Sequence, residues 1–166
     1  MKNMKWKVFF SAFLAAAVFF GIFGVSGAEA EVKVTIKNNR SHNMSFAFRW
    51  AGFDPYHSKG WWTVKAGETR TITIQTVMQM SSGSFGYYAT GGGSTWRGNN
   101  DTGREGWIHP KESFEFEFFP DDNPGNPKSG MQKVLFRPFE PKRGAPNPKL
   151  GGGDRGSATL TFNPSK

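Results

Sequence analysis

Apolar and polar side chains alternate with a period of two in several parts of the sequence. Such alternation places one face of a strand against a core and the other in water. No stretch of helix length after position 30 has the helical period of about 3.6 residues. The sequence therefore predicts an all-β fold, an antiparallel β-sandwich of about eight short strands. The alternating segments are 32–37, 44–50, 71–75, 114–118 and 157–162, and shorter strand candidates are 61–65, 85–90, 95–98 and 133–137.

The first thirty residues have the three-part pattern of a secretory signal peptide. Lysines at positions 2, 5 and 7 precede an apolar run from Val8 to Val25, and Ala28-Glu29-Ala30 supplies the small residues of a cleavage site. We expect residues 1–30 to be removed after Ala30, and 31–166 to form one exported domain, periplasmic or secreted. The run is also close to the lower length limit of a membrane span. Without cleavage, the segment would therefore act as a membrane anchor.

The charge balance restricts the partners of the exported domain. Residues 31–166 hold 18 Lys and Arg against 12 Asp and Glu, an excess of six positive charges. Long-range attraction follows net charge. We therefore expect an anionic partner, namely an envelope polysaccharide, lipid headgroups or an acidic protein. Export makes a nucleic-acid partner unexpected.

Half of the positive excess lies in residues 137–155, where five Lys and Arg stand against two acidic residues and proline and glycine are frequent. Two stretches, 120–130 and 138–156, read as irregular Pro/Gly-rich loops. Long loops of this kind are often either functional or solvated connections. If they are functional, the predicted contacts to an anionic surface are Lys142, Arg143, Lys149 and Arg155.

Aromatic residues form the other group of candidate binding residues. Trp61 and Trp62 are adjacent, as are Tyr87 and Tyr88. Neighbours on a strand point to opposite faces, so one ring of each pair can enter a core. The other needs a covering layer, a partner or a ligand, and exposed aromatic patches mark interaction sites. The predicted binding residues are Trp61, Trp62, Tyr87, Tyr88, Trp96 and Arg97.

Catalytic and metal-binding patterns are weak. The chain has no Cys, which excludes thiolate nucleophiles, thiolate metal sites and disulfides. The three His, at positions 42, 57 and 109, lack the close spacing of a metal site. Glu115 and Glu117 share one strand face and could serve a glycosidase, but paired carboxylates on a strand are more often solvated or ion-paired across the sheet. The sequence predicts no catalytic residue, metal or cofactor.

Short motifs over residues 32–118 resemble a bacterial family of domains of unknown function, the family numbered 1036. They are Gly60-Trp61-Trp62-Thr63-Val64, Ala66-Gly67-Glu68, Tyr87-Tyr88-Ala89 and Trp96-Arg97-Gly98. The resemblance implies a small secreted or envelope protein and supplies no catalytic residues. The sequence departs from the family at Thr69, where such proteins often have a Cys.

Taken together, these features predict an exported, non-enzymatic β-sandwich that serves as a binding or structural module of the cell envelope. Two alternatives stay open. One is a carbohydrate-binding module that uses Trp61 or Trp62. The other is an enzyme that acts on envelope carbohydrate.

Overall fold

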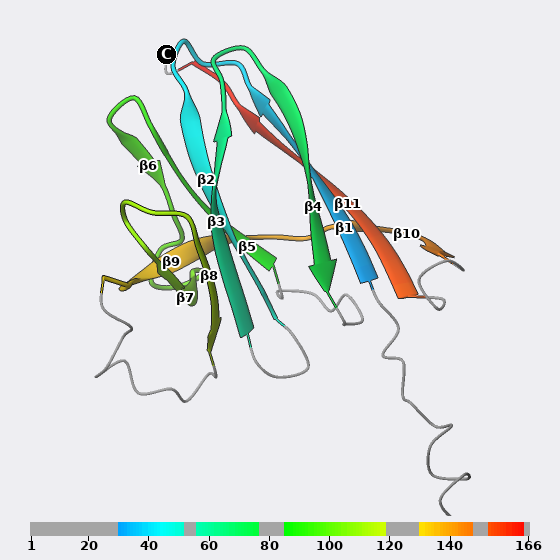
Figure 1. Ribbon diagram of the computed structural model, residues 1–166. Helices are drawn as coiled ribbons and strands as arrows, with labels where there is room; N and C mark the ends of the chain where they lie inside the picture. The colour runs from blue at the N-terminus through cyan, green and yellow to red at the C-terminus, as the bar shows by residue number, and fades with distance from the viewer. Residues whose placement is uncertain (1–29, 52–55, 77–84, 119–129, 148–152, 165–166) are drawn as a thin grey trace, which may run out of the picture.

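The computed structural model describes residues 30–51, 56–76, 85–118, 130–147 and 153–164, and in these ranges the fold is all-β. The strands form two packed sheets, as predicted for a β-sandwich (Figure 1). The described residues form eleven strands, which are β1 (Ala30–Asn38), β2 (Met44–Ala51), β3 (Tyr56–Val64), β4 (Thr69–Thr76), β5 (Phe85–Gly91), β6 (Ser94–Trp96), β7 (Arg104–Ile108), β8 (Phe114–Phe118), β9 (Gln132–Phe139), β10 (Lys142–Asn147) and β11 (Gly153–Phe162).

The smaller sheet has four strands in the order β10-β11-β1-β4. Val34 at the centre of β1 pairs with Ile72 of β4 in antiparallel register and with Ala158 of β11 in parallel register. The expectation of a purely antiparallel sandwich is therefore wrong for the β1–β11 pair. These strands come from opposite ends of the domain, so no hairpin joins them and their relative direction is not constrained by a turn.

The larger sheet has seven strands in the order β7-β9-β5-β2-β3-β8, with β6 paired to β5. It curls until its two ends meet. Trp107 on β7 donates its backbone N–H to Ser58 Oγ of β3 at 3.3 Å, and its ring meets that of Phe116 on β8 with centroids 6.3 Å apart. The strand nearest the middle of this sheet, β2, is consequently buried on both faces.

Each face of the curled sheet covers a separate core. The first core lies between the two sheets and includes Val34, Phe46 and Phe48. The second lies inside the curl, where Ala47, Ile108 and Phe136 are buried. Because consecutive residues of β2 alternate between these two cores, Phe46, Ala47 and Phe48 are all fully buried.

The stretch 138–156, expected to be a loop, contains strand. Lys142 of β10 pairs with Ser157 of β11, and Arg143 pairs with Gly156. The register shifts between Gly144 and Asn147. β10 is an edge strand, and edges and bulges are the places in a sheet that accept Pro and Gly. Residues 148–152, and all of the predicted loop 120–130 except Gly130, lie outside the described residues.

Asn38 at the end of β1 joins the two sheets. Its side chain is fully buried, and Nδ2 donates toward the carbonyl oxygens of His42, Val64 and Lys65 at 2.9, 3.1 and 2.9 Å. Its backbone N–H donates to Glu68 O at 2.9 Å. One amide group thus ties β1 to the connections around β2, β3 and β4.

Candidate functional site

The two adjacent tryptophans of β3 pack in different cores. The Trp62 ring lies in the first core, with its centroid 5.5 Å from that of Phe48. Trp61 is the extra residue of a bulge between β2 and β3, where Phe46 pairs with Trp62 but the next residue of β2 pairs with Gly60. Its ring packs in the second core, and Nε1 donates to His109 O at 2.8 Å. Both side chains are half-buried.

The two adjacent tyrosines of β5 are divided in the same way. Tyr87 is buried in the first core, where its ring meets Phe162 edge-on at 5.8 Å. Tyr88 packs against the second core, 6.2 Å from Phe136. The curled sheet therefore supplies the covering layer that the sequence required for the second ring of each pair. These four rings do not share one exposed face.

Trp96 and Arg97 lie in separate places. Trp96 on β6 is half-buried, with Phe162 edge-on at 5.5 Å and the Arg40 guanidinium 4.9 Å from its ring centroid. Arg97 is exposed and lines a groove of about 540 Å³ together with Glu105 and Lys133. Of the six residues predicted as one binding group, Trp62, Tyr87 and Trp96 thus pack in or against the first core, Trp61 and Tyr88 pack against the second, and Arg97 lines a groove.

The basic residues converge more clearly, on the outward face of the four-stranded sheet. We call this surface the cationic face. Every side chain in it is polar, and it carries four cations and one carboxylate. Its members are Glu31, Lys33, Thr35 and Lys37 of β1, Thr69, Thr71, Thr73 and Gln75 of β4, Arg155, Ser157, Thr159 and Thr161 of β11, and Lys142 of β10.

Strand register arranges the cationic face in rows across the sheet. Lys33 and Lys142 occupy one row, on either side of Ser157. Lys37 lies between Thr69 and Thr161 in another row. Neighbouring strands are about 4.8 Å apart, so Ser157 lies between two lysines in the first row, whereas Lys37 lies between two threonines in the second. Within this set, the carboxylate of Glu31 lies 3.2 Å from Lys33 Nζ.

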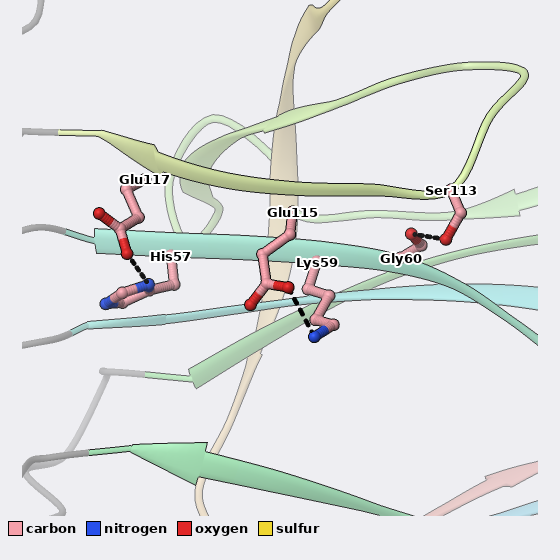
Figure 2. A network of polar contacts seen from close by, with 6 residues as sticks. All are labelled: His57, Lys59, Gly60, Ser113, Glu115 and Glu117. Carbon is pink, nitrogen blue, oxygen red and sulfur yellow. Dashed lines mark hydrogen bonds and ion pairs between the residues drawn. The ribbon is translucent and has the colours of Figure 1, made fainter.

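On the seven-stranded sheet, the carboxylates of the edge strand β8 are paired with basic groups of β3. Figure 2 shows Glu115 and Glu117 of β8 opposite Lys59 and His57 of β3. Lys59 Nζ lies 2.7 Å from Glu115 Oε2, and His57 Nδ1 lies 3.5 Å from Glu117 Oε1. The two glutamates thus form cross-strand pairs, which was the structural alternative to a glycosidase pair. The strands of the four-stranded sheet carry the larger positive excess, six Lys and Arg against two acidic residues, compared with five against three on the seven-stranded sheet.

Two of the four predicted anion contacts belong to the cationic face. Lys142 and Arg155 lie on it and are exposed. Arg143 lies at the register position of Gly156, on the opposite face of the sheet, and Lys149 lies outside the described residues. The prediction missed the lysines of β1 because it assigned the basic surface to loops. The alternation of β1 was the signal that could have placed Lys33 and Lys37 outward.

A further arginine is buried and serves the fold. Arg49 of β2 is 6% exposed; its Nε donates to Glu105 O at 2.8 Å and its guanidinium lies 4.3 Å from the Tyr56 ring centroid. Burial lowers the pKa of Arg49, and Tyr56 opposes that shift through its charge and a side-chain hydrogen bond. The hydrogen bond from Arg49 Nε to Glu105 O links β2 to β7 across the curl.

Two other kinds of feature are absent from the described ranges. His, Asp and Glu side chains there form no group of three or more that could hold a metal ion. Within the same ranges no helix has the length and apolarity needed to cross a bilayer.

Comparison of the whole chain with known proteins gives no family assignment. No protein-family model matches the sequence, and no curated protein matches it. The resemblance of residues 32–118 to the family numbered 1036 therefore stays a prediction.

Proposed function

We propose that this protein is an exported, non-enzymatic binding module of the cell envelope whose cationic face holds an anionic polysaccharide. The observation that carries the proposal is the composition of that face. It is a sheet surface with four cations, one carboxylate and a majority of hydroxyl and amide groups. The signal-like segment at residues 1–30 supports export.

The arrangement of charge favours a polymer that lies across the strands. Lys33 and Lys142 are two strands apart, a separation of about 10 Å between their backbone positions. A chain with repeating carboxylates or phosphates can meet both ammonium groups at once. Exposed cations of one sign also raise the local concentration of such a polymer before contact.

The hydroxyl groups favour a sugar polymer over a lipid surface. Thr and Ser hydroxyls donate and accept hydrogen bonds, as sugar hydroxyls do. Thr35 Oγ1 and Thr71 Oγ1 lie 3.2 Å apart, which shows that neighbouring hydroxyls on this face are close enough to bind one group together. Because every side chain of the face is polar, it has nothing to insert among acyl chains, as interfacial membrane anchors do.

The test measures binding of the protein to polygalacturonate, to neutral dextran of similar length, and to vesicles with and without anionic lipid. We expect polygalacturonate to bind and its affinity to fall steeply as salt rises, because exposed charges are screened over about 10 Å at 0.1 M. Equal binding to dextran, or binding that ignores salt, would contradict the proposal. Tighter binding to anionic vesicles than to the polymer would replace the polysaccharide by lipid headgroups.

Export has a separate test. Mass spectrometry of the protein recovered outside the cytoplasm should find Glu31 at the new N-terminus. Cleavage there would remove Ala30, the first residue of β1, which pairs with Thr76. An intact Met1 would overturn cleavage while leaving the binding test unaffected.

A further inference from the structure

A cleft of about 350 Å³ opens between the two sheets where β5, β6 and β9 face β11. Four aromatic rings line it, from Tyr87, Trp96, Phe139 and Phe162. Phe139 and Tyr87 are neighbours with centroids 6.3 Å apart, and Phe162 contacts both Tyr87 and Trp96 edge-on. The cleft lies in the size range of small-molecule sites, which are mostly apolar with a few placed polar groups.

One cation belongs to this cleft. Arg137 of β9 is directly opposite Tyr87 of β5 in the sheet register, so both side chains leave the sheet on the same side. Arg137 is exposed, whereas Tyr87 is buried. Burial raises the pKa of Tyr87, and Arg137 opposes that shift through its charge and a side-chain hydrogen bond. The guanidinium is therefore close to the phenol while still open to solvent.

The residues that line the cleft favour a negatively charged ligand. Arg137 is its charged residue, and Asn163 contributes a polar group at the β11 side. Asn163 is itself held in place, because Asn39 Nδ2 donates to its Oδ1 at 2.9 Å and Arg40 donates to its backbone oxygen at 3.1 Å. The accessible surface of the cleft is more polar than apolar, because Tyr87 and Phe162 are buried. A guanidinium beside the half-buried rings of Trp96 and Phe139 matches a carboxylate carried on a flat ring system, since Arg binds carboxylates with two parallel hydrogen bonds.

We propose that this cleft binds a small organic carboxylate, with its ring system against the Trp96 and Phe139 side and its carboxylate on Arg137. The cleft meets the cationic face only at Thr161, and none of the four cations of that face lines it. It does not depend on the polysaccharide proposal.

The experiment is calorimetric titration of the full chain with three probes. 2-Naphthoate carries both a ring system and a carboxylate, 2-naphthol carries the ring system alone, and acetate carries the carboxylate alone. We expect naphthoate to bind about tenfold or more tightly than naphthol, and acetate to show no measurable binding. A charged hydrogen-bonding partner contributes roughly that factor. Equal affinities for naphthoate and naphthol would overturn the proposal.

Two variants and one control distinguish the contribution of the Arg137 charge to binding from that of the aromatic rings. Arg137→Ala should reduce naphthoate affinity to that of naphthol and leave naphthol unchanged. Trp96→Ala should weaken both probes alike, and Arg97→Ala, an exposed arginine in the other groove, should change neither. Arg137→Ala also removes the hydrogen-bond partner of the buried Tyr87 phenol, so circular dichroism at the titration temperature must show that this variant is folded before its binding is compared. Unchanged naphthoate affinity in Arg137→Ala would sink the assignment.

Discussion

Trp61 and Trp62 are consecutive residues of β3, but their rings pack in two different hydrophobic cores. The bulge opposite Phe46 and Ala47 directs Trp61 into the curl of the seven-stranded sheet, while Trp62 stays between the two sheets. This division explains how a small domain can hold adjacent large rings without exposing either one fully. It also means that each core can be perturbed separately from neighbouring positions.

Substitution of each tryptophan by Phe tests this division. Trp61→Phe and Trp62→Phe should each lower the free energy of unfolding by roughly 1–2 kcal/mol through lost contact area. Trp61→Phe should cost about 1 kcal/mol more, because it also removes the hydrogen bond to His109 O. In urea unfolding, the double variant should be additive within about 0.5 kcal/mol, since the rings share no core. Coupling well above that value would place them in one core.

Asn38 offers a test of how the sheets are joined. Asn38→Ala should lower the free energy of unfolding by about 2–4 kcal/mol, because buried carbonyl oxygens lose their donor. Asn38→Asp keeps the side-chain shape but places a carboxylate oxygen where Nδ2 faced the backbone carbonyl oxygens. This substitution should therefore destabilise the fold at least as much as Asn38→Ala. Chemical denaturation gives both values. A mild effect of Asp beside a large effect of Ala would show that the side chain only fills space.

Arg49 should prove structural despite its charge. Arg49→Ala removes a buried guanidinium and leaves Glu105 O without its donor, so we expect a loss of about 2–4 kcal/mol in the free energy of unfolding. The matched control is Arg97→Ala at an exposed position, where the change should stay within about 0.5 kcal/mol. Similar melting temperatures for the two variants would refute the role assigned to Arg49.

The raised pKa of Tyr87 predicts how stability depends on alkaline pH. The ordinary phenol has a pKa of 10.0, and burial raises the pKa of Tyr87 above it. Above pH 10 the unfolded phenol ionises first, so the folded state loses stability as pH rises toward the folded pKa. Urea unfolding across this range should show a steeper decline for the wild type than for Tyr87→Phe. Parallel declines would mean that the Tyr87 phenol titrates normally.

Much of the fold follows from the alternation of the sequence, and the strands that were missed have clear reasons. Residues 104–108 on β7 carry two charged residues and a Gly before Trp107, which breaks the alternation. β10 contains Gly and Pro and reads as a loop until its pairing with β11 is known. The side-chain pattern of neither segment predicts a strand. β7 forms by pairing with β9, and β10 forms by pairing with β11.

The surfaces were less predictable than the strands because they depend on strand order. The sequence shows that Trp61 and Trp62 point to opposite faces, but the curl that buries the second face is a tertiary property. Lys33 and Lys37 can be assigned outward from β1 alone. These two lysines share a surface with Lys142 and Arg155 only because the strands lie in the order β10-β11-β1. That order includes a parallel pair between segments far apart in the sequence, β1 and β11.

Charge reversal on the cationic face tests the central proposal most directly. The variant Lys37→Glu/Lys142→Glu is compared with Arg97→Glu/Lys111→Glu, which changes the net charge equally on the connections of the other sheet. The measurement is polygalacturonate affinity at low salt. We predict a loss of at least about tenfold for the first variant, from roughly 1 kcal/mol per surface cation, and a much smaller loss for the second. Equal losses would show that net charge alone attracts the polymer, and would contradict binding at the cationic face.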